Sequence, residues 1–157
     1  MSLEEKVVAL LQEKEYTITT AESCTGGLVA ATIINVSGAS DIYNEGYITY
    51  ANEAKERILG VAHNTLEAFG AVSEQTAKEM ALGAAKAASS NVALSTTGIA
   101  GPGGGNDEKP VGLVYIGCAV NERVEVREYR FEGNRQEIRN AAVNKALQFL
   151  LDNLSKL

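Results

Sequence analysis

The sequence is poor in the residues that metal sites and disulfide frameworks need. Its 157 residues include two cysteines, one histidine, two prolines and no tryptophan. Cys24, Cys118 and His63 are too few to supply the four ligands of a structural zinc site, so we expect no metal. No secretion signal accompanies the cysteines, and we therefore expect two free thiols in a reducing cytoplasm rather than a disulfide.

The sequence also lacks an excess of positive charge and any long apolar run. Its net charge is −6, which argues against nucleic acid as a partner, because such binding depends on cations at the phosphates. No apolar stretch is long enough to span a membrane. Glu4 and Glu5 stand where a signal peptide carries positive charge. We expect a cytoplasmic protein without nucleic-acid or membrane partners, although backbone N–H groups can still bind a small phosphorylated ligand.

Helical and β-prone segments alternate along the chain. The length and the hydrophobic fraction of 45% suit one domain over residues 1–157. Interleaved helices and strands predict an α/β fold, a three-layer α/β/α sandwich, and a late hairpin makes its central sheet mixed. Expected helices cover 3–15, 25–34, 52–59, 74–88 and the region from 134 on, and expected strands cover 17–21, 46–51, 92–97, 112–120 and 124–131.

The stretch TITTAESCTGG, residues 17–27, is the first candidate site. A strand here enters a helix through a carboxylate, a hydroxyl, a thiol, a second hydroxyl and two glycines. The free N–H groups at the helix start, from Cys24 to Gly27, form a cradle for an anion or oxyanion. Alternatively, Ser23 or Thr25 only caps the helix, and the glycines only allow close packing.

A base for Ser23 is the next requirement. The serine hydrolase triad needs a histidine, but His63 is expected in a loop without a motif and reads as a solvated surface residue. Lys55 is expected in the first turn of a helix capped by Asn52, where the dipole and any burial favour the neutral amine. A neutral lysine can take a proton from a serine hydroxyl. An exposed lysine paired with neighbouring glutamates is the alternative.

Four further features are candidates for substrate contact. Tyr50 is expected at the end of a strand. It is either a proton relay, a ring that stacks on the substrate, or only a half-buried aromatic residue. Thr97 ends another strand, where ligands of open α/β sheets bind, or else it only hydrogen-bonds the turn. The following loop, GIAGPGGGNDEKP, has five glycines in eight residues and is either a phosphate nest or simply flexible. Arg139 lies one turn into the last helix, with a phosphate or a surface ion pair as its expected partner.

Taken together, these segments resemble the CinA C-terminal domain family, the nicotinamide-nucleotide amidases. The resemblance covers nearly the whole chain and is to the stand-alone single-domain form, without the large N-terminal domain of full-length CinA. The segments that carry it, in the family's order, are TAESCTGG (20–27), SGAS (37–40), YANEAK (50–55), GAVS (70–73) and TTGIAGPGGG (96–105).

The resemblance implies an enzyme of pyridine-nucleotide salvage that hydrolyses nicotinamide mononucleotide to nicotinate mononucleotide and ammonia, without metal or cofactor. Ser23 would be its nucleophile and Lys55 the base, with Tyr50, Ser40 and Thr97 assisting proton transfer and substrate positioning. A homodimer is also implied. The residues implied for substrate binding, including the phosphate end, are Thr25, Gly26, Gly27, Gly98, Gly101, Gly103 and Arg139.

Two alternatives stay open at this point. Cys24 is a second candidate nucleophile, because a thiol beside a helix N-terminus can have a lowered pKa. The second alternative is that the chain is a non-catalytic nucleotide-binding module, linked to competence or the DNA damage response as the family's name suggests.

Overall fold

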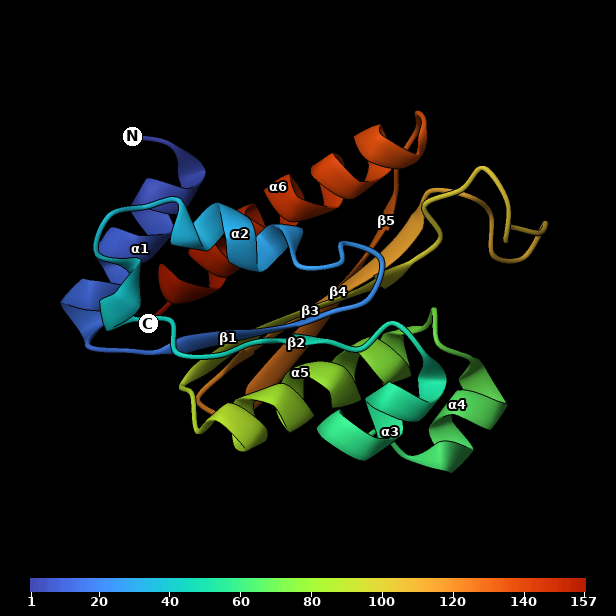
Figure 1. Cartoon of the computed structure of the whole chain (residues 1–157), viewed down its shortest axis with the longest axis horizontal. Coiled ribbons are helices and arrows are strands. Elements are labelled where there is room, and N and C mark those ends of the chain that lie inside the picture. Colours follow the sequence, from blue (N-terminus) through green and yellow to red (C-terminus); the bar gives the residue numbers. More distant parts are fainter.

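A mixed five-stranded sheet forms the middle layer of the protein in the computed structural model, which describes residues 1–157 (Figure 1). The strand order is β2-β1-β3-β4-β5. Strands β2, β1 and β3 are parallel to one another, whereas β4 is antiparallel to both of its neighbours, β3 and β5. The strands are β1 Ile18–Glu22, β2 Tyr47–Ile48, β3 Val92–Gly98, β4 Leu113–Val120 and β5 Arg123–Arg130.

Helices cover both faces of this sheet, which confirms the predicted three-layer α/β/α sandwich (Figure 1). No helix has both the length and the hydropathy needed to cross a bilayer. One face carries α1 Leu3–Lys14, α2 Leu28–Ile34 and α6 Arg135–Leu154, and the other carries α3 Asn52–Leu59, α4 His63–Phe69 and α5 Glu74–Ala88, with a 3-10 turn η1 at Ala39–Asp41.

The two faces have cores of different size. Under α1, α2 and α6 lies a cluster of 23 buried residues, and under α5 a cluster of nine that is rich in alanine. Small residues bring the second layer close: a Cβ at Gly83 of α5 would collide with the carbonyl of Leu59, and one at Gly117 would lie 2.8 Å from the carbonyl oxygen of Ala77. This close packing holds α3, and with it Lys55, against the end of the sheet.

Several local predictions are confirmed. Asn134 and Glu137 form the capping box of α6, and Ser73 caps α5. The β4–β5 hairpin turns at Asn121 and Glu122, which both have positive φ, as a tight hairpin turn requires.

Other boundaries were predicted wrongly. The second helix begins at Leu28 rather than residue 25, because the intervening residues turn through left-handed glycines. Asn52 is the first residue of α3 and Ala51 takes the cap position. The loop expected around His63 is the helix α4. Its start is held by Glu79 of α5, which accepts from the N–H of residue 62 at 2.9 Å, a contact that no local pattern reveals.

Candidate active site

The loop of residues 23–27 joins β1 to α2 at the carboxyl end of the parallel strands. The Ser23 N–H donates to the Thr96 carbonyl of β3 at 3.0 Å, which fixes Ser23 beside the end of that strand. Gly26 and Gly27 then have φ values of 57° and 101°, a region that favours glycine. The sharp turn leaves the Ser23 side chain at the sheet edge, where open α/β sheets bind ligands.

A buried carboxylate lies beneath this loop. Glu22 is 1% exposed, and its two oxygens accept from the N–H groups of Gly27, Val29 and Ala30 at 3.2, 2.8 and 3.0 Å. It also accepts from the Thr25 hydroxyl at 2.6 Å. Of the N–H groups predicted to form an anion cradle, that of Gly27 is therefore used by the protein's own carboxylate, together with the next N–H groups of α2. We missed this in the sequence, where the carboxylate immediately before the loop was the available signal.

This arrangement corrects the roles expected for two loop residues. The Thr25 side chain is fully buried between Glu22 and Thr96, whose hydroxyl oxygen lies 2.7 Å from its own, so it contacts no ligand. Gly27 packs beside Ile48, and its N–H is used by Glu22. The N–H groups of Cys24 and Thr25, by contrast, donate to no protein atom, and they directly follow Ser23.

Lys55 of α3 reaches this loop from the other face of the sheet. Its side chain is 1% exposed, and its Nζ lies 3.2 Å from Ser23 Oγ, 2.9 Å from the Thr49 carbonyl and 3.1 Å from the Tyr50 carbonyl. Burial lowers the pKa of the Lys55 ammonium below its ordinary 10.5. The alternative that Lys55 is an exposed lysine paired with neighbouring glutamates is therefore wrong.

No carboxylate offsets this burial. Glu53 pairs with Arg57 at 2.6 Å, and Glu56 faces His63 at 3.1 Å. A neutral Lys55 amine has two N–H bonds for the two backbone carbonyls and one lone pair for the Ser23 hydroxyl. The geometry suits a general base.

A cavity of about 190 Å³ opens over Ser23 and Lys55. Two basic residues, Lys55 and Arg135, and no carboxylate line it, in a chain whose net charge is −6. The lining residues are Ser23, Cys24, Tyr50, Lys55, Ala71, Val72, Thr97, Gly98, Ala100 and Arg135.

Arg135, at the mouth of this cavity, is a residue that the sequence analysis missed. Its Nη1 donates to the Gly101 carbonyl at 2.9 Å and its Nη2 to the Tyr50 hydroxyl at 3.2 Å. The Tyr50 ring is 65% exposed and reaches Lys55 only through its main-chain carbonyl. Arg135 and Arg139 are one turn apart on α6, so they share a helix face and the sequence offered no means of choosing between them.

Arg139 was the arginine predicted at the substrate phosphate, and the structure places it elsewhere. Its Nε donates to the Cys24 carbonyl at 2.9 Å and its Nη2 to the Thr25 carbonyl at 3.2 Å. It does not line the cavity. Arg139 therefore holds the loop that carries Ser23 from the α6 side.

Thr97 and the glycine loop contribute unequally to the cavity. Thr97 lines it together with Gly98, but its hydroxyl donates to the Ala71 carbonyl at 2.8 Å and ties the α4–α5 connection to β3. Gly101 offers only its carbonyl, to Arg135. Gly103 lies exposed on the loop, with no atom within 4 Å of its Cβ position.

Ser40 is not brought to the cavity. It is exposed in η1, and the carbonyl of nearby Ile42 accepts from Ile18 at the first residue of β1. Ser23 follows the last residue of that strand, so the two serines lie at opposite ends of β1 (Figure 1).

The two remaining candidates do not supply the chemistry. Burial raises the pKa of the Cys24 thiol to about 11, the opposite of what a thiolate nucleophile needs. His63 is an exposed residue between Glu56 and Glu67, at 3.1 and 2.9 Å, and it does not line the cavity. The prediction of a surface histidine is confirmed.

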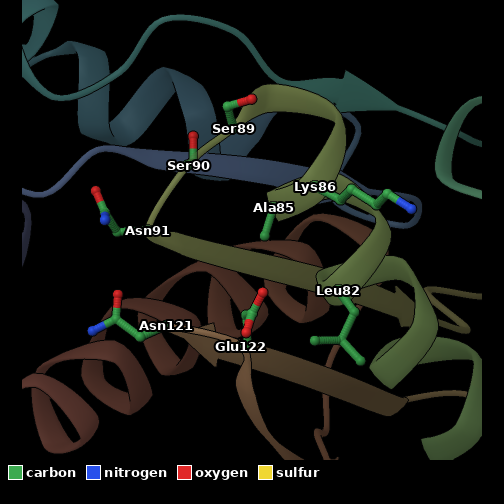
Figure 2. A pocket seen from close by; sticks show the side chains of 8 residues that line it. All are labelled: Leu82, Ala85, Lys86, Ser89, Ser90, Asn91, Asn121 and Glu122. Carbon is green, nitrogen blue, oxygen red and sulfur yellow. The ribbon is translucent and has the colours of Figure 1, made fainter.

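A second and larger depression, of about 760 Å³, lies at the opposite end of the sheet (Figure 2). Its asparagines are engaged elsewhere: Asn91 Oδ1 accepts from the Thr17 N–H, and Asn121 donates to the Tyr16 hydroxyl. Figure 2 shows Lys86 directed away from the serines at positions 89 and 90. This depression therefore holds no nucleophile–base pair like the one at Ser23.

Comparison with known proteins places the chain in a family. A CinA-like protein of Kosmotoga olearia is 57% identical over 149 residues, which are 95% of this chain and 36% of that relative. The chain thus spans little more than a third of the curated relatives it matches.

Two solved structures have the same fold. A competence/damage-inducible protein of Agrobacterium tumefaciens is 44% identical with a TM-score of 0.92, covering 98% of this chain and 93% of its own. A competence damage-inducible protein of Klebsiella pneumoniae is 34% identical with a TM-score of 0.95, over 98% and 95%. The model of the CinA C-terminal domain matches residues 1–154. The chain belongs to the CinA C-terminal domain family.

Proposed function

We propose that the protein is a carboxamide hydrolase that converts nicotinamide mononucleotide and water to nicotinate mononucleotide and ammonia. The observation that carries this proposal is the contact of 3.2 Å between Lys55 Nζ and Ser23 Oγ, with Lys55 buried and without a carboxylate partner. The family resemblance described above supports the choice of substrate.

In the first half of the reaction, Ser23 Oγ attacks the carboxamide carbon while its proton passes to the neutral Lys55 amine. The N–H groups of Cys24 and Thr25, which directly follow Ser23 and have no backbone acceptor, are the candidate donors to the resulting oxyanion. The oxyanion then collapses, the C–N bond breaks, and the leaving nitrogen takes the proton from Lys55 to depart as ammonia. An ester between the nicotinoyl group and Ser23 remains.

In the second half, water replaces ammonia. Lys55 accepts a proton from the water as its oxygen attacks the ester carbon. Ser23 Oγ then leaves, and the Lys55 proton returns to it, which frees the acid and restores the enzyme. Because one amine serves as base and acid in each half, the proton balance closes without a histidine.

Size and charge support a nucleotide substrate. The cavity of about 190 Å³ is smaller than the usual ~300–1,000 Å³ of a site for a whole drug-sized ligand, so it suits the ring that carries the carboxamide. Arg135 stands at the mouth and uses two of the five guanidinium N–H bonds on protein atoms. Its other N–H bonds suit a phosphate outside the cavity.

The test is ammonia release from nicotinamide mononucleotide in the presence of EDTA. Wild-type protein is expected to release ammonia, and Ser23→Ala and Lys55→Met to release none while circular dichroism stays that of a folded protein. Absence of turnover in well-folded wild type, together with nucleotide binding, would instead support a non-catalytic nucleotide-binding module. Full activity of either variant would remove that residue from the mechanism.

A further inference from the structure

We propose that Arg139 is a positioning residue for amide hydrolysis: by binding the Cys24 carbonyl, it orients the N–H of Thr25 as an oxyanion donor. The inference rests on the proposed function. It assigns Arg139 a role in the chemical step rather than in holding the phosphate of the substrate.

The guanidinium contacts the two residues that directly follow the nucleophile. Nε donates to the Cys24 carbonyl at 2.9 Å, and Nη2 donates to the Thr25 carbonyl at 3.2 Å. The planar fork of arginine offers several donors in fixed directions and can span two acceptors, which a lysine cannot reproduce. Both peptide groups are thereby fixed from the α6 side.

The Cys24 carbonyl and the Thr25 N–H belong to the same peptide group. That peptide is trans, since the only cis bond precedes Pro102, so the two groups point in opposite directions within one plane. The carbonyl faces α6, and α6 and α3 cover opposite faces of the sheet (Figure 1). The N–H therefore points away from the Arg139 guanidinium, and Cys24, whose carbonyl belongs to the same peptide, lines the cavity.

This N–H is available, because it donates to no protein atom. A cation at the carbonyl end also polarises the peptide, since hydrogen bonds in series strengthen one another. Fixed, polarised donors are what a developing oxyanion needs. Gly26 leaves space for the guanidinium: a Cβ there would lie 3.2 Å from Arg139 Nη2.

The experiment compares two arginines and two substrates. Arg139→Met, Arg139→Lys and Arg135→Met are assayed on nicotinamide mononucleotide and on nicotinamide riboside, which lacks the phosphate. Removing one oxyanion donor costs about 100- to 1,000-fold in kcat. Because Arg139 only orients its donor, we expect Arg139→Met to lower kcat about 10- to 100-fold on both substrates, with little change in KM and an intermediate result for Arg139→Lys.

Arg135→Met is the matched comparison. It is expected to raise KM for the nucleotide more than KM for the riboside, with kcat lowered less than in Arg139→Met. A loss in Arg139→Met that is confined to the nucleotide would overturn the proposal, because it would place Arg139 at the phosphate after all. Equal losses on the two substrates in KM rather than kcat would overturn it as well.

Two controls separate positioning from folding and from the proposed substrate. Ile33→Ala leaves a cavity in the core under α2 and α6 but removes no contact of the loop that carries Ser23. It should therefore lower Tm while kcat stays at the wild-type value. The rate of Ser23 labelling by phenylmethylsulfonyl fluoride, followed by intact mass, needs no amide substrate. It should fall in Arg139→Met and not in Ile33→Ala.

The labelling result also distinguishes the two proposals. If wild type releases no ammonia yet labels at Ser23, the proposed function has failed, and slower labelling of Arg139→Met still supports the positioning role. Labelling of Arg139→Met at the wild-type rate overturns that role whether or not the protein turns over the nucleotide.

Discussion

Lys55 Nζ and Ser23 Oγ lie 3.2 Å apart, although the residues are 32 positions apart in the chain. Ser23 lies in the loop between β1 and α2, and Lys55 lies in α3, which covers the other face of the sheet. The pairing depends on burial of a long cationic side chain, which is costly unless the amine is neutral. Backbone carbonyls rather than carboxylates receive its N–H groups. Burial without a carboxylate partner therefore favours the neutral amine, the form that a serine–lysine mechanism needs.

The first prediction concerns the pH dependence of activity. Because Lys55 must be neutral to act as base and burial lowers its pKa from 10.5, kcat/KM should rise with pH and level off below pH 10.5. The kinetic profile is measured between pH 5 and 10 on wild type and Cys24→Ala, which should share the same inflection. Loss of activity in Cys24→Ala would instead point to the thiol as the nucleophile.

The same shift predicts a change in stability with pH. Since the pKa of Lys55 is lower in the folded than in the unfolded chain, the unfolded chain binds more protons between those two values. Through Lys55, the free energy of unfolding therefore increases as pH rises from the pKa of the folded chain to that of the unfolded chain, at about pH 10.5. Urea titrations of wild type and Lys55→Met should differ in their pH slope, and identical slopes would contradict the shift.

Glu22 is expected to stabilise the fold through four hydrogen bonds. Glu22→Gln keeps the size of the side chain but turns one acceptor into a donor that faces the N–H of Ala30. An unsatisfied buried group of this kind costs about 1–3 kcal/mol. Urea unfolding should show a loss of that size, whereas Glu53→Gln, whose side chain is 70% exposed, should change the free energy of unfolding little.

His63 is expected to stabilise the α3–α4 junction at acidic pH. Hydrogen bonds and charge from Glu56, with Glu67, raise its pKa above 6.5. This contribution is complete below the unfolded-state pKa and is lost as pH rises through the folded value. His63→Gln should therefore lower Tm at pH 5 more than at pH 9. An equal change at both pH values would show that charge plays no part.

The implied homodimer has a candidate surface at the β2 edge. Ile34 and Ile48 are 56% and 59% exposed, and residues 23–40 contain no charge. Two copies of net charge −6 repel least where exposed apolar side chains such as these, rather than charged ones, meet. Ile48→Lys should convert a dimer to a monomer, measured by light scattering, whereas Val111→Lys, directly after the glycine loop, should not. A monomeric wild type would end this proposal.

The sequence by itself determined the alternation of helices and strands, the hairpin at Asn121 and Glu122, and the caps of α5 and α6. Those features depend on residues within a few positions of one another. It also made Ser23 and Lys55 candidates, because a hydroxyl before a glycine turn and a lysine in a first helical turn are local patterns, whereas their roles as nucleophile and base were implied by the family resemblance.

Only the tertiary structure decided how these parts meet. The burial of Lys55 depends on carbonyls at residues 49 and 50 and on a hydroxyl across the sheet edge. The separate roles of Arg135 and Arg139 depend on loops about 34 and 115 positions away. Contacts at such separations leave no periodicity in the sequence, because they arise where the end of one strand, a helix start and a loop converge.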